Sequence, residues 1–171
     1  ARVRPWFLIL IAILCFMLYE LIQAPFYGLG AYGFALGILL STGLGVVMPL
    51  LALTRRLGIP FRAQFQLERP KLGLTLAVTA ATLSLIPALE IMTGAMARRY
   101  PPEASYMEFV EMLRPESLPA FLAVLVALVL AVPLAEELIF RGLLQRILLR
   151  HSGPVLSVLL VALLFGAVHP L

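Results

Sequence analysis

The charge-free stretch of residues 21–54 constrains the fold of this chain more than any other feature of its sequence. A helix that crosses the hydrocarbon core of a bilayer needs about 20 mainly apolar residues, and this stretch is longer. Apolar runs continue elsewhere, so that 62% of the chain is hydrophobic and 13% is charged. An average soluble domain is about 45–50% apolar and about 25% charged. The composition therefore excludes a soluble globular domain and predicts an integral membrane protein.

Five apolar runs are candidate membrane spans: residues 6–22, residues 24–53, residues 72–94, and runs that start at Leu118 and at Pro154. A cleavable signal peptide is the alternative for the first run, but no cleavage site followed by a soluble sequence comes after it. We expect an all-α, polytopic transmembrane helical bundle that forms a single domain over residues 1–171. Residues 1–117 would supply three spans and an outer interfacial segment, and residues 118–171 a helical hairpin whose last span is truncated.

The distribution of charge predicts the orientation of this bundle. Basic residues, among them Arg2 and Arg4, precede the first run and fill the loop of residues 54–71, and others lie in residues 141–150. The loop of residues 95–117 has three Arg against four Glu. Because cytoplasmic loops are enriched in Arg and Lys, we expect the N-terminus to lie in the cytoplasm. Helical spacing of Tyr106 and Phe109 predicts a short amphipathic helix in the outer loop.

Three other features carry no functional signal. The net charge of +4 is divided among clusters between the apolar runs, so no continuous basic face predicts nucleic-acid binding. Gly28, Gly30 and Gly33 spell G-x-G-x-x-G, but no strand precedes them and no acidic residue follows at the required distance. The single cysteine, Cys15, lies within an apolar run and is expected to be an inert core thiol.

The residues that predict chemistry are Glu136, Glu137 and Arg141, which follow an apolar run directly. On a helix, Glu137 and Arg141 are i,i+4 neighbours and can form an ion pair. Glu136 points about 100° away from Glu137, so that this pair leaves it available. Pro133 removes one backbone hydrogen bond just before the two glutamates and predicts a kink there. The alternative is that both glutamates only mark the point where the helix leaves the membrane.

His169 is the expected partner of Glu136. Ser152, Gly153 and Pro154 predict a turn, with Ser152 as the helix N-cap. Glu136 and His169 are equally distant from the centre of this turn, so an antiparallel hairpin would bring them to one height. A break at Gly142 would disrupt this register. A Glu beside a His within a membrane can hold a water and act as a general base.

These residues resemble the first two motifs of the CAAX-processing and bacteriocin-processing (CPBP) family of intramembrane endopeptidases, the type II CAAX prenyl endopeptidases and bacterial self-immunity proteins. The matching residues are Glu136-Glu137-x-x-x-Arg141 and Phe165-x-x-x-His169. The resemblance implies an all-helical protease that cleaves peptide bonds at the cytoplasmic side of the membrane. Its substrate would be a protein or peptide, prenylated or not. The protease itself would be surrounded by the lipid of a bacterial-type plasma membrane. In the family, the residue corresponding to Glu136 activates water and that corresponding to His169 helps to hold it. Glu137 and Arg141 would have structural or substrate-orienting roles.

The resemblance leaves two points open. The family has been classed as metallopeptidases, although a metal-free glutamate mechanism is favoured for its eukaryotic-type branch; we expect no cofactor, with zinc at Glu136 and His169 as the alternative. The family's third motif, His-x-x-x-Asn/Asp, supplies oxyanion donors, and this chain contains neither Asn nor Asp. We therefore expect the chain to be the inactive N-terminal part of a longer enzyme. The alternative function is that of a non-enzymatic membrane immunity or scaffold protein.

Overall fold

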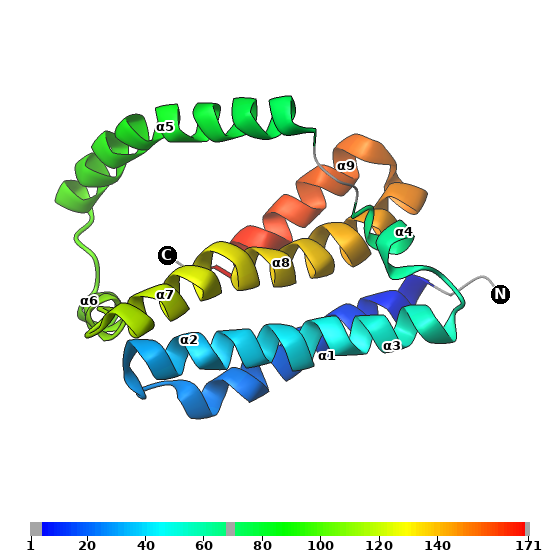
Figure 1. The fold of residues 1–171 in the computed structure, drawn as a ribbon. Coiled ribbons are helices and arrows are strands. Elements are labelled where there is room, and N and C mark those ends of the chain that lie inside the picture. Colours follow the sequence, from blue (N-terminus) through cyan, green and yellow to red (C-terminus); the bar gives the residue numbers. More distant parts are fainter. Residues whose placement is uncertain (1–4, 68–70, 170–171) are drawn as a thin grey trace. The chain divides into compact units, whose positions relative to one another are not determined.

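A computed structural model describes residues 5–67 and 71–169, and these residues form helices and no strand (Figure 1). The all-α prediction is therefore confirmed. Four helical segments are long and apolar enough to cross a membrane: Trp6–Phe26, Gly30–Arg56, Leu72–Arg99 and Leu118–Ala167. The chain divides into two compact units, one of Ala1–Gln66 with Leu113–Leu171 and one of Leu67–Met112. Arg2, Arg4 and Arg69, which contribute to the predicted orientation, lie outside the described residues.

The first unit begins with a helical hairpin. Helix α1 (Pro5–Gln23) and the short 3-10 helix η1 (Ala24–Phe26) lead into a turn and then into α2 (Gly30–Leu40). The π-helix η2 (Ser41–Val47), α3 (Met48–Arg56) and α4 (Phe61–Phe65) follow. Gly28 and Gly30 have φ angles of +83° and +70°, which only glycine adopts readily, so two glycines of the G-x-G-x-x-G pattern shape this turn. These glycines therefore form a turn between two helices rather than a nucleotide-binding loop.

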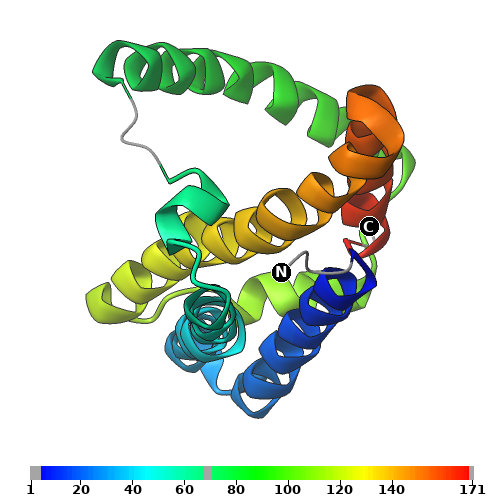
Figure 2. The ribbon, with the colours of Figure 1, turned by 90° about the vertical axis from the view of Figure 1, so that its right-hand side faces the viewer.

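The second half of this unit is a bent hairpin. Helix α7 (Leu118–Val126), π-helix η3 (Ala127–Ala131), α8 (Val132–Glu136), π-helix η4 (Glu137–Gln145) and α9 (Arg146–Ala167) follow one another directly. Gly153 breaks α9 with φ 75° and ψ 170°, and the chain reverses there, as the orange-to-red ribbon of Figure 2 shows. This reversal lies within the predicted turn of Ser152, Gly153 and Pro154. Ser152 is not the helix N-cap in the predicted way, because its hydroxyl donates to the carbonyl of Leu148.

The core of the first unit lies where α1, η2, α3, η4 and α9 converge. Cys15 is fully buried there, as expected of a core thiol. Gly142 does not break the helix. It leaves room for Phe65 of α4, since a Cβ at Gly142 would lie within 2.6 Å of atom Cε1 of that ring. This contact fixes α4 against the helix that carries the paired glutamates.

The second unit consists of α5 (Leu72–Arg99), which contains Pro87, and α6 (Ala104–Met112). No residue of α5 is buried by the rest of the described chain, although the helix is apolar along most of its length. Such a helix is stable where lipid rather than water surrounds it. Helix α6 confirms the predicted short helix around Tyr106 and Phe109.

Candidate active site

Pro133 shapes the helix that carries the two glutamates. Its ring nitrogen has no hydrogen to donate, so the regular i→i−4 ladder is interrupted at this position. The helix changes from the π pattern of η3 to the α pattern of α8 at Val132, and back to a π pattern after Glu136. Glu136 is therefore the last residue of α8, and Glu137 the first of η4. Wide π turns of this kind occur often at functional sites.

Glu137 and Arg141 form the predicted i,i+4 ion pair, with 2.5 Å between Arg141 Nη1 and Glu137 Oε1. Both side chains are largely exposed in the described chain. Exposed pairs of this kind contribute little to stability, about 0–1 kcal/mol. The pair therefore orients two charged groups beside Glu136 more than it holds the fold together.

Glu136 and His169 come together across the hairpin, as their equal distances from the turn predict. Atom Nε2 of His169 lies 3.3 Å from Oε1 of Glu136. The Glu136 side chain is 29% exposed and that of His169 is 49% exposed, so the contact lies at the edge of the packed core. The two residues are 33 positions apart in sequence, and the reversal at Gly153 brings them into contact.

Aromatic contacts hold the His169 ring in place. The ring stacks on Phe165 with 4.3 Å between centroids, and Phe165 meets Phe140 edge to face at 5.1 Å. Atom Nδ1 of His169 lies 2.8 Å from the carbonyl oxygen of Phe165. Sequence reasoning did not single out Phe140, although it follows Glu136 by four positions and so shares its helix face.

The hydrogen bonds of His169 limit the protonation states of the pair. A carbonyl oxygen only accepts, so Nδ1 carries a hydrogen and donates it to Phe165. In a neutral ring, Nε2 is then an acceptor and cannot donate to an ionised Glu136. The direct contact consequently contains one proton, held either on Nε2 or on the carboxyl group. Removal of that proton leaves two acceptors facing each other, and a water can donate to both.

An open cavity of about 480 Å³ lies beside this pair. One wall carries Glu136, Glu137, Arg141 and Gln145, with Phe140 among them. The other wall is apolar and is formed by Val158, Val161, Ala162 and Phe165 of α9. The cavity thus combines two carboxylates and a guanidinium with a surface for apolar side chains. Sequence reasoning missed Gln145, which lies one turn beyond Arg141 on the same wall.

Metal binding is limited by the number of available ligands. Catalytic zinc takes three protein ligands, and Glu136 with His169 would provide two. Within residues 5–67 and 71–169, no group of three His, Cys, Asp or Glu side chains could hold a metal ion. The described residues therefore do not form a zinc site by themselves.

Comparison with known proteins finds a match to the part of the chain that carries the candidate active site. Residues 118–171 match the family model described as Type II CAAX prenyl endopeptidase Rce1-like, and this range contains both motifs. No curated protein and no solved structure matches the chain. The match confirms the resemblance found in the sequence and supports a CAAX-type intramembrane protease in general. Over residues 118–171, the chain is thus similar to the Rce1-like type II CAAX prenyl endopeptidases.

Proposed function

We propose that this protein is an intramembrane endopeptidase that hydrolyses peptide bonds at the cytoplasmic side of the membrane, with a water activated by Glu136 and His169. The observation that carries the proposal is the 3.3 Å contact between these side chains at the edge of an open cavity. The alternative, a membrane scaffold or immunity protein, needs no acceptor pair beside a cavity.

The reactive state has an ionised Glu136 and a neutral His169. A water between them donates one hydrogen to the carboxylate and one to Nε2, which leaves its oxygen lone pairs free for attack. Two hydrogen bonds of about 2.8 Å place the acceptors about 4.5–5.5 Å apart, so the Glu136 carboxylate has to move about 1–2 Å away from the His169 ring, which Phe165 holds. The partial exposure of the Glu136 side chain permits this movement.

Attack on the peptide carbonyl transfers one proton of the water to Glu136. The protonated carboxyl group then donates this proton to the leaving amine nitrogen, so that the base of the first step is the acid of the second. His169 keeps its Nδ1 hydrogen on the Phe165 carbonyl throughout and holds the water by Nε2. Arg141, oriented by Glu137, would bind a carbonyl or carboxylate of the substrate in the same cavity.

The oxyanion of the tetrahedral intermediate needs further donors. The chain has no Asn or Asp for the third family motif, so we propose that these donors come from additional sequence of a longer enzyme. The cytoplasmic orientation of the N-terminus, a bacterial-type membrane and a substrate that is a peptide, prenylated or not, belong to the same proposal. The excess of Arg in residues 141–150 over acidic residues supports the cytoplasmic placement of the hairpin turn.

Replacement of Glu136 by Gln tests the mechanism in the complete gene product, reconstituted in liposomes and assayed with quenched fluorescent peptides. We expect the hydrolysis rate to fall by about 10²–10⁴, because the amide keeps the shape of the side chain but cannot accept the proton. Glu90→Gln, the same change on α5, is the control and should retain the rate. Equal rates for the two variants would refute the role of Glu136, and no hydrolysis by the wild type would favour the scaffold. Loss of the wild-type rate on chelation, restored by zinc, would favour the metal alternative.

A further inference from the structure

A second cavity of about 240 Å³ lies at the end of the first unit where α1 begins and α9 reverses. Its walls are apolar and include Leu8 of α1, Leu53 of α3, Phe65 of α4 and Ile147 of α9. It shares no lining residue with the cavity beside Glu136. Helices α1, α3, α4, η4 and α9 therefore enclose a largely apolar space that the proposed proteolysis does not use.

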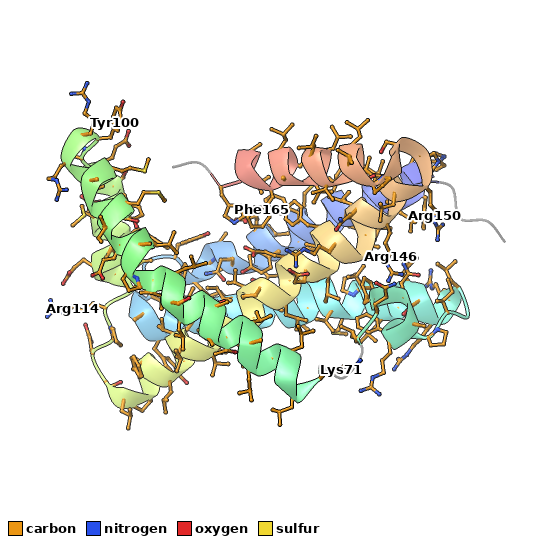
Figure 3. All side chains as sticks on the ribbon, turned by 90° about the horizontal axis from the view of Figure 1, so that it is seen from above. Lys71, Tyr100, Arg114, Arg146, Arg150 and Phe165 are labelled. Atoms are coloured by element: carbon orange, nitrogen blue, oxygen red, sulfur yellow. The ribbon has the colours of Figure 1, made fainter. Side chains whose placement is uncertain are left out.

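Two arginines line one side of this cavity. Arg146 and Arg150, labelled in Figure 3, are i,i+4 neighbours on α9. Both side chains line the cavity. Arg146 is half-buried and Arg150 is exposed. Among the described residues, neither guanidinium lies within 4 Å of a carboxylate, in contrast to Arg141. The cavity thus presents two uncompensated positive charges next to an apolar wall.

The surroundings of the cavity mark the level of lipid headgroups. Trp6 precedes the lining residue Leu8 by two positions and is 58% exposed, as is typical of the aromatic side chains at a membrane interface. Arg55 and Arg56 end α3 directly after the lining residues Leu53 and Thr54. Charged side chains at such positions reach the interface while their stems stay against apolar groups. An occupant of this cavity therefore meets headgroups on one side and acyl chains on the other.

We propose that this cavity binds one anionic phospholipid. Its phosphodiester lies between Arg146 and Arg150, and the first methylenes of an acyl chain lie against Leu8, Leu53 and Ile147. Basic pockets between transmembrane helices at the cytoplasmic side bind anionic headgroups in this way. The volume equals about eight waters at about 30 Å³ each, enough for a phosphate and a few methylenes but not for two acyl chains. A zwitterionic lipid would bring its ammonium group toward two cations.

The bound lipid has a structural consequence for the candidate active site. Phe65 of α4 lines this cavity and also packs on Gly142 of η4, the helix that begins with Glu137. A lipid held between α4 and α9 would stabilise this contact. The inference does not depend on proteolysis, because lipid binding can be measured without any substrate.

Native mass spectrometry of the purified chain in detergent micelles tests the proposal by titration with phosphatidylglycerol and with phosphatidylcholine of identical acyl chains. We expect one retained phosphatidylglycerol, bound about tenfold or more tightly than phosphatidylcholine. The double variant Arg146→Gln/Arg150→Gln should weaken phosphatidylglycerol about tenfold or more. Arg55→Gln/Arg56→Gln removes the same charge at the same end, outside the cavity lining, and should change binding by less than about threefold.

Three results would overturn the proposal. The first is equal affinity for the two lipids, and the second is equal weakening of phosphatidylglycerol binding by the two double variants. The third is that inorganic phosphate alone protects the chain against thermal unfolding as much as phosphatidylglycerol does. The first would indicate an unselective apolar site, the second attraction by bulk charge, and the third a site for free anions. Circular dichroism checks the fold of each variant. If Arg146→Gln/Arg150→Gln does not fold, the exposed Arg150→Gln alone should still weaken phosphatidylglycerol about threefold or more, and unchanged binding would refute the role of the arginines.

Discussion

The close approach of η2 to the backbone of α1 is predicted to make Gly45→Ala strongly destabilising. Gly45 lies on η2 against the backbone of α1, and a Cβ there would be 2.9 Å from the nitrogen of Tyr19 and 3.1 Å from the carbonyl carbon of Leu18. Ordinary contacts of a Cβ are 3.4–4 Å, so the two helices must separate by about 0.5 Å or more. Backbone atoms cannot rotate away as a side chain does. Such overpacking costs about 1–3 kcal/mol, or about 5–150-fold in the unfolding equilibrium constant.

Gly43→Ala is the matched control, because Gly43 lies on the same π-helix and a Cβ added there would have nothing within 4 Å. This variant should unfold at the same denaturant fraction as the wild type or at a slightly higher one, since alanine favours a helix by up to about 1 kcal/mol over glycine. Reversible unfolding in mixed micelles of dodecyl maltoside and dodecyl sulfate, followed by circular dichroism, measures both. If Gly45→Ala is as stable as Gly43→Ala, close backbone packing does not hold α1 against η2.

Two further changes test the helix that carries the glutamates. Gly142→Ala should lower the free energy of unfolding by about 1–3 kcal/mol in the same assay, because the added Cβ would collide with the ring of Phe65. Gly166→Ala is the control and should not lower it, because a Cβ added at Gly166 would have nothing within 4 Å. Arg141→Gln should change the unfolding free energy by less than about 1 kcal/mol, because the pair with Glu137 is exposed. It should nevertheless reduce peptide hydrolysis by the complete enzyme. A change in the unfolding free energy above about 2 kcal/mol would assign Arg141 a structural role.

The sequence alone predicted the parts of this molecule that depend on local chemistry. The charge-free stretch of residues 21–54 predicted spanning helices, and Ser152-Gly153-Pro154 predicted the reversal. Glu137 and Arg141 pair because their spacing on one helix allows it. The contact between Glu136 and His169 also followed from sequence, since a tight hairpin pairs residues that are equidistant from its turn.

The features that sequence reasoning missed depend on packing between segments that are distant in the chain. The π turns η3 and η4 flank Pro133, but the sequence predicted only a kink because the extra width depends on neighbouring helices. Gly142 looked like a potential helix break, whereas its role is to admit Phe65, 77 residues earlier in the chain (142 − 65). The cavity lined by Arg146 and Arg150 likewise needs α1, α3 and α4, which no local pattern relates to α9.

The hydrogen bond from His169 Nδ1 to the Phe165 carbonyl is what turns the Glu136–His169 contact into a site for water. Without this bond the ring could place its hydrogen on Nε2 and donate to an ionised Glu136, and the deprotonated pair would be satisfied with no third molecule. With Nδ1 committed to Phe165, the deprotonated pair has two acceptors and no hydrogen between them. Phe165, near the end of α9 and four positions before His169, thus sets the tautomer of His169 through its backbone carbonyl. The aromatic stack of Phe165 on the imidazole then holds the ring where Nε2 faces the carboxylate.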